Sequence, residues 1–284
     1  MTLRLLPLLA LLAAASPAWA APVGALAPAP PNAASPHVAP LTVPMAAHRA
    51  SYDLTLDTVH GGETVAASGH MTYQVTDACS SWATQQQLTL RTVTRDGGET
   101  DLTSDYATLE GKDGHHLAFD MKQRSNGAVV EEIRGEAVTD ATGAGRIRYT
   151  LPKPATVMLA PGTLFPMAHT EAIIQAAHAG LKSIAPTLFD GTGPDGAQDT
   201  YVTILNAHPA PPTPLDRPEL AHLGTSQVHV AFFSQAPATI TPDYETAMRY
   251  YDNGIADELR MDFGGFTMRG ALHTLTLPKK SARC

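Results

Sequence analysis

Twelve histidines are spread over this chain of 284 residues, and the imidazole ring is the commonest metal ligand in proteins. A metal site needs several ligands that point to one place. His115 and His116 are adjacent, so in a strand their side chains point to opposite faces. His169 and His178 are nine positions apart in a segment with helical spacing, and the sequence contains no H-E-x-x-H motif. The sequence therefore predicts no metal site.

Gly191, Gly193 and Gly196 match the spacing of the dinucleotide-binding motif G-x-G-x-x-G. That motif binds a phosphate group only where it follows a strand and opens a helix. Here a helical pattern precedes the glycines and a strand pattern follows them, so we predict a connecting loop. We expect no cofactor.

Catalytic nucleophiles and acid–base pairs are also without a supporting motif. The sequence has no G-x-S-x-G turn. Glu131-Glu132 and Asp257-Glu258 are neighbours in strand patterns, so we predict that the members of each pair face opposite sides and are solvated. A Ser-His-Asp site requires no sequence motif and remains an alternative. We nevertheless predict that the protein is not an enzyme.

Two cysteines occur, Cys79 and the last residue, Cys284. Residues 1–20 have the pattern of a secretory signal peptide, namely Arg4, an apolar run and an A-x-A site that predicts cleavage after Ala20. An oxidising compartment favours one Cys79–Cys284 disulfide, although two unpaired thiols are an alternative. The bridge would close a loop of about 200 residues and would stabilise the fold by at most ~5 kcal/mol.

Composition divides the rest of the chain into two parts. Residues 21–44 are rich in Pro and Ala and predict a semi-rigid tether. Residues 45–284 are predicted to form a single domain. The net charge of −8 and the scarcity of basic runs argue against a nucleic-acid partner.

Alternation of apolar and polar residues with period two dominates residues 45–284, as in Met71, Tyr73 and Val75. This pattern is typical of antiparallel strands with one buried face. Asp-Gly and Asn-Gly pairs lie between the runs, where hairpin turns require positive φ angles. We predict an all-β, mainly antiparallel fold of about 13–14 strands.

One segment, Pro166–Lys182, has helical spacing instead. Its apolar side is predicted to be Ile173, Ile174, Ala177 and Leu181, with His169 on the opposite, polar side. We predict one amphipathic helix among the strands.

Six short segments resemble the EipB family of cell-envelope-integrity proteins in their order and spacing. They are His48-Arg49-Ala50, Gly69-x-Met71-x-Tyr73, Pro161-Gly162-Thr163-x-Phe165-Pro166, Leu188-Phe189-Asp190-Gly191, Tyr250-Tyr251-x-Asn253-Gly254 and Asp262-Phe263-Gly264-x-Phe266. The resemblance extends to Cys284. The sequence departs from the expected family pattern at Gln227-Val228, where we expect a Trp-Pro pair.

The resemblance implies a large, open, curved antiparallel sheet, called a β-spiral, with the helix on its concave side and the Cys79–Cys284 bridge. It also implies a periplasmic, non-enzymatic role in envelope integrity in Gram-negative bacteria, with a periplasmic TPR-repeat protein as partner. The alternative is a carrier for a lipid or a lipoprotein acyl chain in the concave face. In that case we expect an apolar trough under the helix, lined by Leu117, Phe119 and Phe232.

Overall fold

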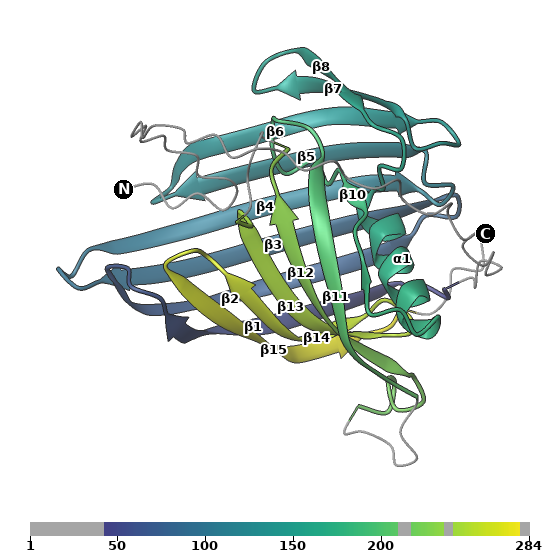
Figure 1. Cartoon of the computed structure of the whole chain (residues 1–284). Helices are drawn as coiled ribbons and strands as arrows, with labels where there is room; N and C mark the ends of the chain where they lie inside the picture. Colours follow the sequence, from purple (N-terminus) through teal and green to yellow (C-terminus); the bar gives the residue numbers. More distant parts are fainter. Residues whose placement is uncertain (1–42, 210–216, 236–240, 279–284) are drawn as a thin grey trace, which may run out of the picture.

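The computed structural model describes residues 43–209, 217–235 and 241–278. One 15-stranded antiparallel sheet and one helix, α1 (Pro166–His178), make up its regular structure (Figure 1). The predicted all-β fold is confirmed. The number of strands exceeds the predicted 13–14 because two strands, β9 (Ser183–Ile184) and β10 (Thr187–Leu188), have only two residues each and are too short to show alternation in the sequence. The strands are β1 His48–Val59, β2 Thr64–Asp77, β3 Ser81–Thr94, β4 Glu99–Gly111, β5 His116–Ser125, β6 Ala128–Thr139, β7 Gly145–Leu151, β8 Ala155–Leu159, β9 Ser183–Ile184, β10 Thr187–Leu188, β11 Gln198–His208, β12 Thr225–Phe233, β13 Tyr244–Tyr251, β14 Ala256–Asp262 and β15 Phe266–Thr276.

The sheet is open, with the strand order β10-β11-β12-β13-β14-β15-β1-β2-β3-β4-β5-β6-β7-β8. β15 pairs with β1, so the last strand joins the C-terminal series to the N-terminal series. Figure 1 shows the result: β2 to β6 form one wall, and β11 to β14 curve in front of them. The concave face of the sheet thus encloses an interior.

Asn-Gly pairs, which favour positive φ angles, form two of the hairpin turns. Asn126 and Gly127 alone connect β5 to β6, with φ angles of 51° and 80°. Two consecutive positive φ angles define the hairpin turn that Asn-Gly favours. The turn predicted at Asn253-Gly254 is also present, between β13 and β14.

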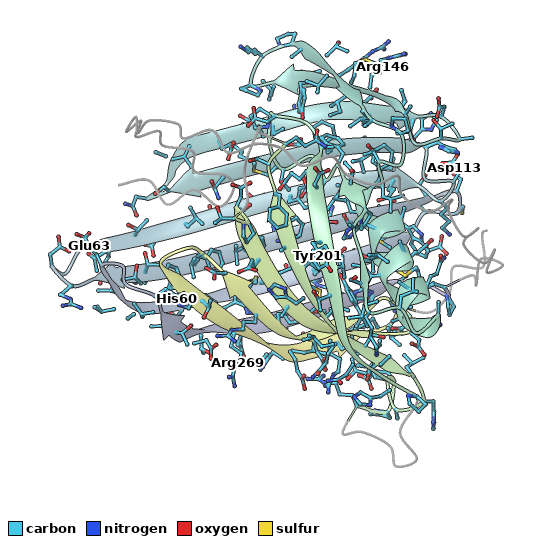
Figure 2. The ribbon with its side chains drawn as sticks, in the orientation of Figure 1. His60, Glu63, Asp113, Arg146, Tyr201 and Arg269 are labelled. Carbon is cyan, nitrogen blue, oxygen red and sulfur yellow. The ribbon has the colours of Figure 1, made fainter. Side chains whose placement is uncertain are left out.

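Alternation decides which side chains enter the interior. In β3, Trp82, Leu88 and Leu90 are buried on the concave face, whereas Gln85 and Gln87 are exposed on the convex face. Exposed charged side chains such as Arg269 and Arg146 lie on the outside of the sheet (Figure 2). The period of two therefore sorts the residues between the core and solvent.

The two ends of the sheet are joined by loop and side-chain contacts and by one isolated parallel bridge, between Leu164 after β8 and Leu188 of β10. The segment between β10 and β11 lies against the concave face of β4 to β7. There the Tyr149 hydroxyl donates to the Gly193 carbonyl at 3.0 Å, and the Tyr106 hydroxyl donates to the Asp190 carbonyl. Phe189 packs edge-on against Phe119. We call this set of contacts the seam.

The helix ends earlier than the sequence pattern predicts. Gly180 has a φ of +73°, and the Leu181 amide donates to the Ala176 carbonyl at 3.0 Å. This is the six-to-one hydrogen bond of a glycine-terminated helix. Leu181 therefore lies beyond the helix, and 49% of its surface is exposed. Its predicted place on the buried side of the helix is wrong.

Candidate ligand cavity in the concave face

A cavity of about 270 Å³ lies inside the curved sheet, between β1 to β3, β13, β14 and α1. Five of the nine methionines of the chain line it: Met45, Met71, Met167, Met248 and Met261. Four tyrosines also contribute: Tyr52, Tyr73, Tyr244 and Tyr250. Its volume is slightly below the roughly 300–1,000 Å³ typical of ligand pockets.

Methionine and tyrosine give this cavity an adaptable apolar lining. Methionine is unbranched and polarisable, so it fits irregular ligands and is common at promiscuous binding surfaces. The Tyr52 hydroxyl donates to the Ala256 carbonyl at 2.7 Å, which fixes that ring in the wall. The combination gives an apolar wall whose methionine side chains can change conformation.

Helix α1 forms part of the cavity wall through Met167 and Thr170. Met167 also packs against Val75 and Trp82 of β2 and β3. On its other side, Ile173 packs with Val202 and other residues of β11 and β12. The helix therefore lies between the two walls of the curved sheet, on the concave side, as predicted.

Glu110 of β4 holds the first turn of the helix. One of its carboxylate oxygens accepts the Met167 amide at 2.8 Å, and the other accepts the Ala168 amide at 2.9 Å. Phe165, at the N-cap, supplies no side-chain cap, so Glu110 satisfies amides that would otherwise be unpaired. Burial raises the pKa of Glu110 to about 7, against the opposing effect of the two amides. Nothing in the local sequence signals this role, because Glu110 precedes the helix by more than 50 positions.

His178 holds the other end of the helix. Its Nε2 lies 2.7 Å from Asp252 Oδ1, and Asp252 Oδ2 accepts the Gly224 amide at 2.9 Å. The position of the helix in the fold thus depends on ionisable contacts at both ends.

The prediction for the buried side of the helix is correct for three of its four residues. Ile173, Ile174 and Ala177 are buried, whereas Leu181 is not. His169, predicted on the polar side, is buried as well, and its Nε2 lies 3.1 Å from Thr200 Oγ1 of β11. Burial lowers the pKa of His169 to about 4, so the ring is neutral. A role of these residues as a ligand groove stays a prediction.

The apolar trough predicted under the helix does not exist in that form. Leu117 and Phe119 pack in a separate cluster with Phe165 and Phe189, at the seam. Phe232 instead lies beside Tyr244, with ring centroids 5.6 Å apart. The prediction assigned all three residues to one surface, but the curvature of the sheet separates them.

The glycine-rich segment is a loop, as its context predicts. A side-chain carbon at Gly191 would lie 2.5 Å from the Phe119 ring, and its φ is +76°. Glycine is therefore required here for close packing at the seam.

No group of three or more potential metal-ligating side chains occurs among the residues that the structure describes.

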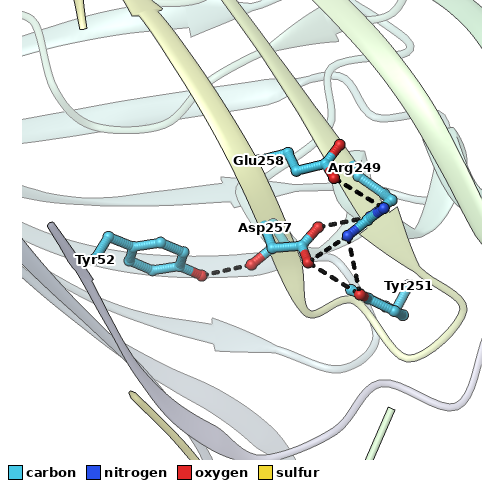
Figure 3. A network of polar contacts seen from close by, with 6 residues as sticks. Tyr52, Arg249, Tyr251, Asp257 and Glu258 are labelled. Atoms are coloured by element: carbon cyan, nitrogen blue, oxygen red, sulfur yellow. Dashed lines mark hydrogen bonds and ion pairs between the residues drawn. The ribbon is translucent and has the colours of Figure 1, made fainter. Parts of the chain in front are cut away.

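The prediction that Asp257 and Glu258 are both solvated is wrong for Asp257, which is buried, and holds for Glu258, which is exposed. A β-bulge changes the alternation between them. Glu258 has a φ of +51°, and the register of β13 and β14 shifts at this point. Both carboxylates consequently bind the same guanidinium, that of Arg249 (Figure 3). Asp257 is 7% exposed and accepts from Arg249 Nε and Nη2 at 2.8 Å each and from the Tyr251 hydroxyl at 2.9 Å. Tyr251 is likewise buried, and burial followed by the charge of Asp257 raises its pKa to about 12.

Replacing Asp257 should therefore be costly. In Asp257→Ala, Arg249 loses two of its hydrogen bonds and the buried Tyr251 hydroxyl loses its acceptor. We expect a loss of about 2–3 kcal/mol in the free energy of unfolding, measured with urea. Glu258→Ala is the matched control. It removes a carboxylate whose side chain is 53% exposed from the same arginine and should cost less than about 1 kcal/mol. Equal losses in the two variants would contradict the structural role of Asp257.

The predicted disulfide and the predicted N-terminal segments fall largely outside the described residues. Cys79 lies in the turn between β2 and β3, with a φ of 65°, but Cys284 is not described. The bridge between them stays a prediction. The signal peptide at 1–20 and all but the last two residues of the tether at 21–44 are also not described. In the part of the chain that is described, no helix is long and apolar enough to cross a membrane.

An open antiparallel sheet that curls around a Met- and Tyr-lined cavity, with one helix inside, defines a barrel-like β protein with an interior pocket. The EipB-like family model matches residues 40–279, so the chain belongs to the EipB-like family. It is 30% identical over 237 residues to the cell envelope integrity protein EipB of Brucella abortus (strain 2308), covering 81% of this chain and 83% of that protein. A crystal structure of a beta-barrel-like protein of domain of unknown function DUF1849 from Brucella abortus is also similar. It has a TM-score of 0.75 and 29% identity, and the match covers 84% of this chain and all of that chain.

Proposed function

We propose that this protein supports cell-envelope integrity in the periplasm as a non-enzymatic binding protein whose ligand site is the concave cavity. The name of the Brucella relative supports the role in envelope integrity. The signal-peptide pattern at residues 1–20, with cleavage after Ala20, supports the periplasm. The cavity supports the binding of an apolar group, such as a lipid or lipoprotein acyl chain.

The single observation that carries this proposal is the composition of the cavity wall. A core position needs only a well-fitting side chain, whereas a ligand site needs a concave apolar surface that leaves space unfilled. Five methionines and four tyrosines surround about 270 Å³ of such space. The helix that closes one side is held at its ends and contributes Met167 to the wall. The cavity is thus built into the fold.

Absence of catalysis is part of the proposal. His48 is the one imidazole in the described wall of the cavity, and its Nδ1 lies 2.8 Å from the Ala46 carbonyl. Burial lowers the pKa of His48. The described wall of the cavity contains no Ser or Cys that could act as a nucleophile and no Asp or Glu that could orient the His48 ring as a base.

A second candidate function is the binding of a protein partner, such as the periplasmic TPR-repeat protein that the family resemblance implies. The observation that favours it is the edge strand β8, which pairs with β7 on one side and with no described strand on the other. Met158 of β8 is 73% exposed. An open edge with an exposed apolar side chain can accept an added strand or an apolar partner surface.

Native mass spectrometry of the protein purified from its own envelope without detergent exchange separates the two functions. If the cavity is the ligand site, the protein should carry a small apolar molecule. Ala256→Phe, which fills the cavity, should remove it, whereas Ala271→Phe, on an exposed convex position, should retain it. An empty cavity together with a stoichiometric protein partner would favour the second function and would contradict the first.

A further inference from the structure

The cavity wall contains no formally charged side chain. Among the described residues that line it, none is Lys, Arg, Asp or Glu. His48 is buried and neutral, because burial lowers its pKa. An ionised ligand group would therefore lose its hydration without gaining a counter-ion, which costs several kcal/mol. The site selects against charge.

Two polar side chains in this wall have no hydrogen-bonding partner among the described residues. They are the Tyr73 hydroxyl of β2 and the Gln86 amide of β3, both half-buried. Tyr73 and Gln86 are directly opposite each other in the ladder between these strands, on the concave face. Residues opposite each other in antiparallel strands lie within reach of one ligand group. By contrast, the Tyr52 hydroxyl in the same wall is already bonded to Ala256.

Tyr73 remains a hydrogen-bond donor at physiological pH. Burial raises its pKa above the ordinary value, and the nearby Tyr250 and Glu110 act in the same direction. The phenol therefore keeps its proton. The Gln86 side chain offers a second N–H donor beside it.

We infer that the cavity holds a single acyl chain that ends in an uncharged ester or amide carbonyl, with Tyr73 and Gln86 donating to that carbonyl oxygen. This inference rests on the proposed function and defines the ligand class of the same site. Two adjacent donors match the two lone pairs of a carbonyl oxygen. A fatty-acid carboxylate would bring an unneutralised charge into the cavity, close to Tyr73, on which the charge of Glu110 already acts.

The inference is tested with two probes of the same chain length, monodecanoylglycerol and decanoate. Each is titrated by calorimetry into the full-length mature protein at about pH 8, below its critical micelle concentration. We expect the ester to bind at least about tenfold more tightly than the carboxylate. We also expect the ester to be recovered intact, since the site is not catalytic.

Variants of the two donors provide the second part of the test. Tyr73→Phe and Gln86→Met should each weaken binding of the ester about five- to tenfold, the usual effect of one lost hydrogen bond, and should leave decanoate binding unchanged. Gln85→Met is the matched control, because Gln85 is the neighbouring glutamine on the convex face. It should bind both probes as the parent protein does.

The outcomes separate this inference from the proposed function. If neither probe binds and a small hydrophobic dye also fails to bind, the cavity is not a ligand site and both are overturned. If both probes bind equally, or if the ester binds unchanged to the Tyr73→Phe and Gln86→Met variants, the cavity is a ligand site but the assigned carbonyl contact is wrong.

Discussion

Ile173→Asp should lower the free energy of unfolding by about 4–6 kcal/mol and should strongly increase binding of a hydrophobic dye. Ile173 is 1% exposed and packs with Val202, Val228 and Val230 of the opposing strands. The substitution removes about 1.5–3 kcal/mol of apolar burial and adds the cost of placing a carboxylate among aliphatic side chains. Since a domain is stable by only about 5–15 kcal/mol, the variant should be close to unfolding. Urea denaturation and dye fluorescence measure both effects.

Two further variants keep this prediction testable if Ile173→Asp fails to fold. Ile173→Val should cost about 0.5–1.5 kcal/mol and leave the fold intact. Leu181→Asp is the matched control, because the sequence pattern assigns Leu181 to the same helix side whereas the structure exposes it. It should change stability by less than about 0.5 kcal/mol. A large loss in Leu181→Asp, or none in Ile173→Asp, would contradict the observed docking of the helix.

Glu110→Gln should remove a distinct pH dependence of stability. The pKa of Glu110 is raised from 4.5 to about 7 in the folded protein, so the folded state binds the proton more tightly than the unfolded state. The stability contributed by this group is therefore fully present below about pH 4.5 and is lost as the pH rises through about 7. As the pH rises from about 4.5 to about 7, the free energy of unfolding of Glu110→Gln should increase by about 3 kcal/mol relative to that of the parent. Each unit of pKa shift corresponds to about 1.4 kcal/mol.

The measurement is the difference in the free energy of unfolding between the two proteins across this pH range, in which all other titrating groups cancel. Glu110→Ala is the companion variant. It leaves the amides of Met167 and Ala168 without an acceptor and should lose about 2–4 kcal/mol even at the acidic limit. If the difference in the free energy of unfolding between the parent and Glu110→Gln did not change with pH, Glu110 would not titrate as the structure indicates.

Sequence periodicity predicted the features of this fold that depend on near neighbours. The strands, the Asn126-Gly127 hairpin and the start of the helix at Pro166 all follow from local rules. The end of the helix is also locally encoded, because Gly180 adopts the left-handed conformation that terminates it. The predicted continuation to Lys182 gave the apolar spacing of Leu181 more weight than this glycine.

The remaining features depend on partners that are distant in sequence. His169 is buried because Thr200 lies opposite it, and Glu110 holds a helix that begins at Pro166. The bulge at Glu258 breaks the alternation that predicted opposite faces for Asp257 and Glu258. The pairing of Tyr73 with Gln86 likewise required the strand register. Polar residues in a strand give no local signal of which distant group will approach them.

The seam has a mechanical consequence. In a sheet closed by hydrogen bonds, the strand number and stagger fix the radius, and widening it would break a ladder. Here the two sheet ends meet through contacts such as those of Tyr149 with Gly193 and of Phe119 with Phe189. None of these contacts belongs to a ladder between two strands, although Leu164 also forms a single backbone bridge with Leu188 of β10. Widening the interior would therefore first expose the buried rings of Phe119 and Phe189, while the ladder between β1 and β15 stays paired.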